Sequence, residues 1–233
     1  MIVVRSAILL CLGSALVGRA ALAQVGHEPR QSPYRDLEWR QELTVFGGQF
    51  RAAVDPAKVA PRNGPMIGAH YELRLGGPAY FTARIAGVLS DRNIIDPKLE
   101  EANRLKDPDH TVPLVLADVG FSLNLTGFKS YRGIVPFLGA GAGLGAGIEK
   151  QDVGGYQFGY PFLFTVRPGL KIATAGQWHV RVEATNYFYR IRYPETYFVK
   201  TGADDPVLQP GSSRNYWKRN LGLNLGMTYS YGR

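Results

Sequence analysis

The feature that most constrains this sequence is an alternation of apolar and polar residues that recurs in short segments along the chain. In 66–75 (MIGAHYELRL), every second residue from Ile67 onward is apolar, and the residues between are glycine, histidine or charged. Such a spacing places successive side chains on opposite faces of a β-strand. The same pattern recurs in 80–89, 114–125, 162–172, 178–188 and 221–231. The chain is therefore predicted to be all-β.

Two further segments bring the number of predicted strands to eight. Segment 42–51 has apolar residues on both faces, so its outward face stays unassigned. Segment 134–147 is mostly Gly and Ala, which weaken a strand prediction but permit close strand approach and strong curvature in a closed barrel.

The connections between these strands alternate in length. They are 52–65, 76–79, 90–113, 126–133, 148–161, 173–177 and 189–220, long and short in turn. Long loops at one end and short turns at the other are typical of bacterial outer-membrane barrels. We therefore predict an eight-stranded antiparallel up-and-down transmembrane β-barrel over 42–231.

The polar face of the predicted strands carries both signs of charge. An eight-stranded barrel is just wide enough to be filled by side chains, and buried charges must pair there. We predict an interior polar network of Glu72, Arg74, Arg84, Asp118, Arg167, Lys171, Arg181 and Glu183, together with His70 and His179. A soluble barrel with reversed faces, enclosing an apolar cavity, shows the same alternation and stays the alternative.

The last predicted strand follows a polar-x-Gly-x-x-aromatic-x-aromatic pattern at Asn224, Gly226, Tyr229 and Tyr231. In this segment and in its eight-strand pattern, the chain resembles the small bacterial outer-membrane β-barrel family of OmpA/OmpX-like and OmpW-like proteins. The resemblance implies that these four residues form the insertion signal read by the outer-membrane assembly machinery. Family members commonly end on the aromatic residue, whereas Gly-Arg follows it here.

Residues 1–23 have the features of a secretory signal peptide, with Arg5, an apolar stretch and Ala-Leu-Ala at 21–23. We expect export to the bacterial outer membrane, with 24–41 as a periplasmic lead-in. The single Cys, Cys11, lies within this signal. The remaining chain therefore offers no disulfide framework and no Cys-based metal site.

Possible catalytic and cofactor residues have simpler interpretations. His70 and His179 are interpreted as members of the interior network, and no His-x-Ser triplet supports a lipid-modifying enzyme. The run 141–146 looks like a dinucleotide fingerprint, but no helix is predicted after it. We expect no enzyme activity, cofactor or metal, and a structural or surface-interaction role. The alternatives are a narrow pore for small solutes and a lipid-modifying enzyme.

Two loops carry further predictions. Segment 96–107 has Leu99, Ala102 and Leu105 at helical spacing, which predicts a short amphipathic helix. Loop 189–220 is rich in cationic and aromatic residues. These side chains suit contacts with outer-membrane lipids and lipopolysaccharide, or an ordinary aromatic belt with snorkelling cations. The net charge of +8 is spread along the chain, so we expect no nucleic-acid partner, and a monomer.

Overall fold

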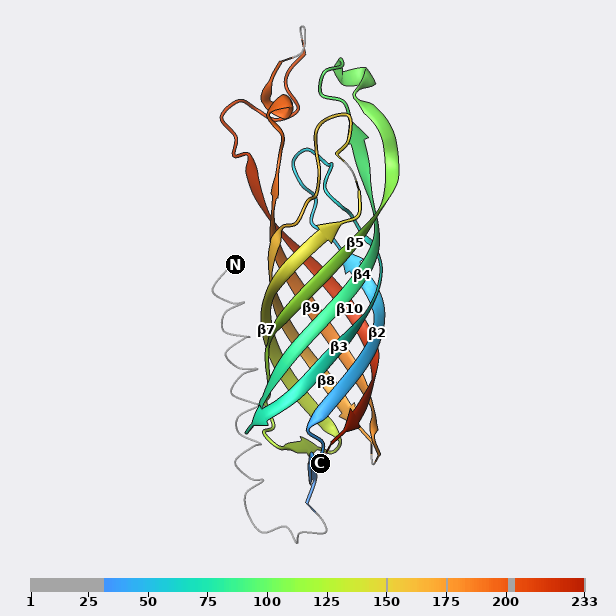
Figure 1. Cartoon of the computed structure of the whole chain (residues 1–233), viewed down its shortest axis with the longest axis vertical. Coiled ribbons are helices and arrows are strands. Elements are labelled where there is room, and N and C mark those ends of the chain that lie inside the picture. Colours follow the sequence, from blue (N-terminus) through green and yellow to red (C-terminus); the bar gives the residue numbers. More distant parts are fainter. Residues whose placement is uncertain (1–31, 150, 175, 201–203, 233) are drawn as a thin grey trace, which may run out of the picture. The chain divides into compact units, whose positions relative to one another are not determined.

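The computed structural model describes residues 32–149, 151–174, 176–200 and 204–232. The signal peptide predicted at 1–23 and residues 24–31 of the predicted lead-in lie outside these residues. The described residues form a closed antiparallel β-barrel (Figure 1). In this part of the chain no helix is long and apolar enough to cross a membrane.

Eight long strands form the ring. They are β2 (Gln41–Arg51), β3 (Gly64–Gly76), β4 (Ala79–Ile95), β5 (Leu105–Asn124), β7 (Ile134–Gly147), β8 (Phe162–Ala173), β9 (Trp178–Arg192) and β10 (Asn215–Tyr231). Each pairs with its neighbours in chain order, and β10 pairs with β2 to close the ring. The predicted eight-stranded up-and-down barrel is confirmed. The loops 52–63, 96–104, 148–161 and 193–214 share one end, called here the loop end, and the opposite end is the turn end (Figure 1).

The helix predicted for 96–107 is wrong. Only η2 (Glu101–Asn103) is helical, a single 3-10 turn with no buried residue. Ile95 pairs with Leu105 and Ile94 with Asp107, so the β4–β5 hairpin continues past the predicted strand ends. The hairpin ladder satisfies the backbone groups there, whereas a helix of two or three turns would be marginal without an apolar surface to pack against.

A short strand pair at the turn end was not predicted. β1 (Tyr34–Asp36) pairs with β6 (Lys129–Tyr131), which lies in the connection between β5 and β7. Arg74 Nη1 donates to the carbonyl oxygen of Leu37 at 2.9 Å, which ties this segment to β3. Three-residue strands lack enough periodicity to be recognised from sequence.

The two faces of the barrel wall differ as the alternation predicts. Outward side chains are apolar and exposed, with Ile67 at 67% and Leu225 at 61%, whereas inward Phe50 is fully buried. The structure also settles the face of β2, because Glu42 is buried while Val45 is exposed. In glycine-rich β7, a Cβ at Gly143 would overlap the backbone of β5, so this close approach requires glycine.

Candidate functional site

A buried cluster of charged residues fills the barrel interior from its middle to the turn end. Its members, called here the ion cluster, are Glu42, His70, Glu72, Arg84, Asp118, Arg167, Lys171, Arg181 and Glu183. Each points inward from a ring strand because it stands at one of the alternating positions whose side chains face the interior. All are less than a tenth exposed, so they must compensate one another's charge.

The ion pairs nearest the turn end meet at Glu72. This carboxylate forms an ion pair with Arg181 Nη1 at 2.9 Å and another with the ammonium of Lys171, and Ser122 Oγ donates to it at 2.9 Å. Lys171 also reaches Glu42 Oε2 at 2.8 Å. Two anions and two cations thus share one site across β2, β3, β8 and β9.

The cluster continues toward the middle of the barrel through Glu183 and Asp118. Glu183 contacts Arg181 at 3.1 Å and Arg84 at 3.3 Å. Arg167 is paired with Asp118, and its Nη2 donates to Thr82 at 2.9 Å. Arg84 of β4 and Glu183 of β9 lie on opposite sides of the ring, and only β7 separates Asp118 of β5 from Arg167 of β8, so these two ion pairs reach across the lumen at this level.

The structure brings together eight of the ten predicted network residues, and the other two lie nearer the turn end. Arg74 is only partly buried and lies over the Phe128 ring at 4.9 Å. His179 borders a turn-end pocket of about 590 Å³ that also contacts Lys171 and Glu42. Sequence reasoning missed Glu42, because the mixed faces of 42–51 hid its parity. Glu42 lies directly opposite Glu72 on the neighbouring strand, and only the register of β2 and β3 shows this.

With Thr44 of β2 as its register partner, His70 lies within the ion cluster. Its ring nitrogens are 3.6 Å from Glu72 and 3.8 Å from Glu183, and the adjoining void is only about 10 Å³. Among the described residues, no group of three or more His, Cys, Asp or Glu side chains is arranged to hold a metal ion. The void has room for about one water molecule and for no substrate.

The loop-end half of the interior is filled by apolar and aromatic side chains instead. Its members, called here the aromatic core, include Phe46, Phe50, Met66, Val112, Leu114, Phe158, Leu163, Tyr187, Tyr189 and Ile191. Tyr156, Tyr193, Tyr197 and Leu208 extend this core from the barrel into the loops. Phe158 packs edge-on against Tyr189 at a centroid distance of 5.4 Å. The loops therefore pack as a cap on the barrel.

Buried polar contacts hold the loop cap in place. Asp55 accepts from Tyr193 Oη at 2.8 Å and from the backbone N–H of Ala60 at 3.1 Å. Arg92 pairs with Asp152 at 2.8 Å and with Glu149 at 3.0 Å. Burial, together with the Asp55 charge, raises the pKa of Tyr193 well above its usual value.

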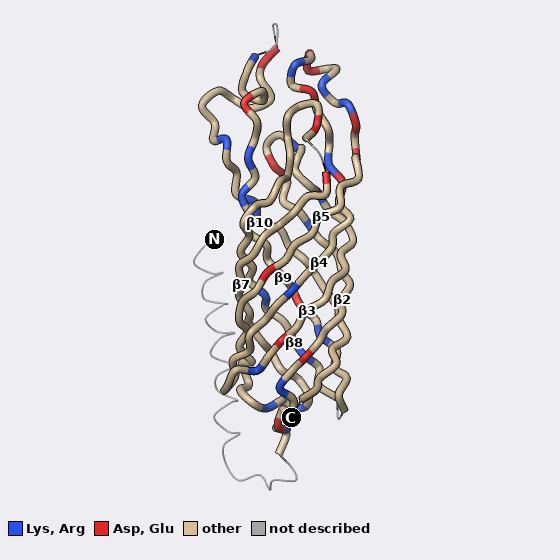
Figure 2. Tube along the Cα trace, viewed as in Figure 1, with Lys and Arg blue, Asp and Glu red and all other residues tan. Residues whose placement is uncertain are grey.

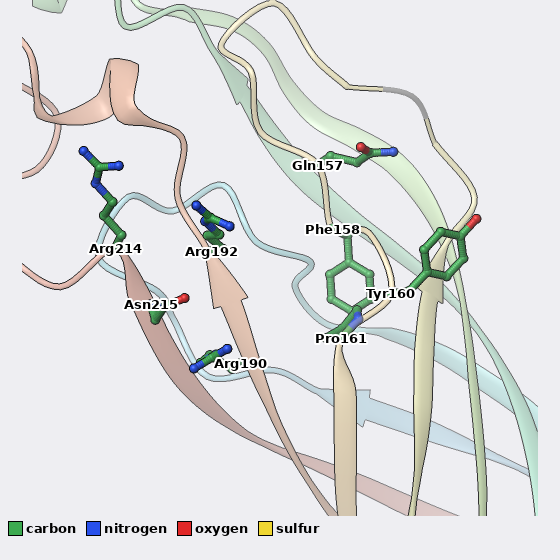
Figure 3. A pocket seen from close by; sticks show the side chains of 8 residues that line it. All are labelled: Gln157, Phe158, Tyr160, Pro161, Arg190, Arg192, Arg214 and Asn215. Carbon is green, nitrogen blue, oxygen red and sulfur yellow. The ribbon is translucent and has the colours of Figure 1, made fainter.

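An exposed pocket of about 490 Å³ lies at the loop-end rim (Figure 3). Arg190 and Arg192 lie one above the other along β9, with Arg214 and Asn215 at the start of β10. Gln157, Phe158, Tyr160 and Pro161 complete the lining. Arg214 is paired with Glu195 at 2.7 Å. The pocket is therefore cationic, with aromatic side chains beside it.

The C-terminal strand carries its predicted motif on both faces. Asn224 is buried and Gly226 shares its inward face, while Tyr229 and Tyr231 stack with ring centroids 6.0 Å apart. Trp178 lies 5.0 Å from Tyr229, so three aromatic side chains gather at the turn end of β9 and β10.

Comparisons with solved structures assign this fold. Neisserial surface protein A aligns with 82% of this chain and 97% of its own chain, with a TM-score of 0.52 and 12% identity. The outer membrane protein OprG from Pseudomonas aeruginosa aligns with 84% of this chain and 98% of its own, with a TM-score of 0.50 and 8% identity. No protein-family model and no curated protein matches the sequence.

The protein therefore has the eight-stranded β-barrel fold of small bacterial outer-membrane proteins. The resemblance expected from the sequence is confirmed for the fold. At 8–12% identity, the similarity carries no ligand or activity over to this chain.

Proposed function

We propose that this chain is an integral protein of the bacterial outer membrane, a closed monomeric barrel with a structural or surface-interaction role. The turn end then faces the periplasm and the loop end faces the cell exterior. The outward belt supports insertion, since Val119, Phe121 and Leu225 are each more than half exposed. Such apolar exposure is unfavourable in water and is satisfied by lipid.

The observation that carries the closed-barrel proposal is the filling of the middle of the barrel and of its loop end by side chains. The ion cluster and the aromatic core occupy successive levels of the barrel, and the loop cap covers the second. The turn-end pocket reaches only as far as the charged groups of Lys171 and Glu42. A continuous water path would have to break ion pairs among residues that are nearly inaccessible.

A surface-interaction role is supported by the order of the loop cap. Buried contacts such as Tyr193 with Asp55 and Arg92 with Asp152 give the loops one packed arrangement. A loop surface that is already ordered binds a partner with a smaller entropic cost. The tight packing around His70, whose adjoining void is only about 10 Å³, leaves no space for a substrate and argues against a lipid-modifying enzyme.

The test begins with the folded full chain in detergent, analysed by heat-modifiability on a gel and by circular dichroism. A heat-dependent shift with a β spectrum is expected, and a protein that stays soluble without detergent would establish the soluble alternative. Planar-bilayer recordings should then show no regular conductance steps, with a known porin as positive control. Reproducible small steps would establish the narrow pore instead. A change in lipid A that depends on His70 would establish an enzyme.

We also propose that Asn224, Gly226, Tyr229 and Tyr231 form the signal read by the assembly machinery. The expected result for Tyr229→Ala with Tyr231→Ala is less folded protein in cells but normal refolding of the purified protein in detergent. Equal losses in both settings would mean that the aromatic residues only stabilise the barrel.

A further inference from the structure

A row of arginines lies on the outer wall of the barrel just beyond its apolar belt. Register places Trp217 of β10 opposite Arg190, Asn215 opposite Arg192, and Leu221 opposite Arg51 of β2. Arg219 is diagonal to both Arg190 and Arg51. These four exposed arginines, Arg51, Arg190, Arg192 and Arg219, form an arginine row across three adjacent strands. Figure 2 shows Lys and Arg positions gathered at the loop end of β9 and β10.

The row lies at the height of lipid headgroups if the barrel spans a membrane. On β10 the outward positions from Tyr229 to Leu221 are apolar or aromatic, and Arg219 comes next. At about 3.3 Å per residue and a tilt of about 40°, the rise from Tyr229 to Arg219 is roughly 25 Å, the height of a typical apolar band. Trp217, which is 58% exposed, lies beside Arg190 as an interfacial aromatic residue.

The charge of the row is not neutralised within the described part of the chain. No ion pair to Arg51, Arg190, Arg192 or Arg219 is formed there, and Arg219 Nε donates only to the neutral Asn186 at 3.1 Å. The β4 side of the barrel differs, since Arg62 there is paired with Asp91 at 2.7 Å and with Asp109. The arginine row is therefore a positive patch without an ion-pair partner among the described residues.

A shallow apolar groove of about 870 Å³ lies on the same wall, on the turn-end side of the row. The groove runs from Gly47 of β2 past Leu223 and Leu225 of β10 and Val182 and Ala184 of β9, and continues to Pro168 and Leu170 of β8 and Pro136 of β7. Small side chains at Gly47 and Ala184 leave the depression between larger neighbours. Guanidinium groups above an apolar groove match a lipid with phosphates above acyl chains.

We propose that the arginine row and this groove bind one phosphorylated, multiply acylated glycolipid of the outer leaflet, lipopolysaccharide. The guanidinium groups hold its phosphates, and the groove receives an acyl chain. This proposal rests on the proposed membrane insertion and identifies the lipid that the wall selects.

The experiment measures binding of bisphosphorylated lipid A, its dephosphorylated form and phosphatidylglycerol to the detergent-folded full chain by native mass spectrometry. Heat-modifiability is checked first, so a failure to form a membrane barrel is distinguished from a failure to bind lipid. We expect lipid A to bind tightest, and Arg190→Gln with Arg192→Gln to weaken it about tenfold. Lys98→Gln with Lys106→Gln removes the same charge from exposed loop-end positions and should leave binding unchanged.

A second variant tests the groove separately from the charges. A Cβ at Gly47 would meet only a carbonyl oxygen at 3.9 Å, so Gly47→Leu is expected to fold and to fill the groove. It should weaken lipid A severalfold with the arginine row intact. The proposal is overturned if the double arginine variant binds lipid A as the wild type does, or if phosphatidylglycerol binds as tightly as lipid A. Unchanged binding by the Gly47 variant would remove the groove from the site.

Discussion

The two halves of the barrel interior are filled by opposite chemistry. The ion cluster consists of charges that compensate one another across the ring, while the aromatic core consists of packed rings that continue into the loops. Charge pairs depend on each partner being present, whereas apolar packing depends on filled volume. The comparison teaches that the interior is filled in two different ways, and that each filling should fail in its own way.

The largest expected effect comes from breaking the ion cluster. Glu72→Gln should lower the free energy of unfolding by about 3–5 kcal/mol, because Lys171 and Arg181 lose a shared buried partner. Reversible urea unfolding in lipid vesicles measures the loss. Glu195→Gln breaks an exposed pair with Arg214 and should cost about 0–1 kcal/mol. Equal small losses would mean that water reaches the cluster.

The aromatic core should respond to lost volume. Leu114→Ala should lower the free energy of unfolding by about 2–5 kcal/mol, because Leu114 is 1% exposed and a cavity would replace its side chain. Leu225→Ala, on the exposed outer wall, is the matched control with a smaller expected cost. Conductance should stay absent in both variants, since the ion cluster still closes the lumen. Conductance in Leu114→Ala would show that the aromatic core is the main barrier.

The loop cap contains a buried hydrogen bond from Tyr193 to Asp55. Tyr193→Phe leaves Asp55 without its hydroxyl donor and should cost about 1–3 kcal/mol. Limited proteolysis of the loops measures the effect, since cleavage should quicken while the barrel stays resistant. Tyr160→Phe removes the same atom from a side chain that is 78% exposed, and should change nothing. Identical digestion patterns would mean that the cap does not depend on Asp55.

The smallest effect at neutral pH concerns the tyrosines of the cap. Burial raises the pKa of Tyr193 and of Tyr156 above their usual values. A pKa raised by folding means stability that is present below the unfolded value, about 10, and lost as the pH rises beyond it. Loop cleavage should therefore begin only above about pH 10, and Tyr193→Phe should weaken this dependence. A pH-independent digestion would contradict the burial of these hydroxyl groups.

Both the eight strands and their faces follow from the sequence because a spacing of two is a local property. The alternation in 66–75 predicts that Ile67 and His70 lie on opposite faces of the strand. In the structure Ile67 faces outward and His70 faces inward. The alternation of loop lengths likewise identified the up-and-down ring. Periodicity failed where neighbouring residues did not alternate, as in 42–51, and where an apparent helical spacing lay in a hairpin extension, as in 96–107.

The partners within the barrel were decided only by the tertiary structure. Glu72 and Lys171 are 99 residues apart and meet because ring closure places β3 and β8 across one narrow lumen. Likewise, Asp55 and Tyr193 meet because two loops fold over the same end. The arginine row arises from the register of β2, β10 and β9, and this register cannot be read from the sequence of any one strand. Sequence alone therefore determined which face the side chains take wherever apolar and polar residues alternate, and the closed ring determined which side chains meet.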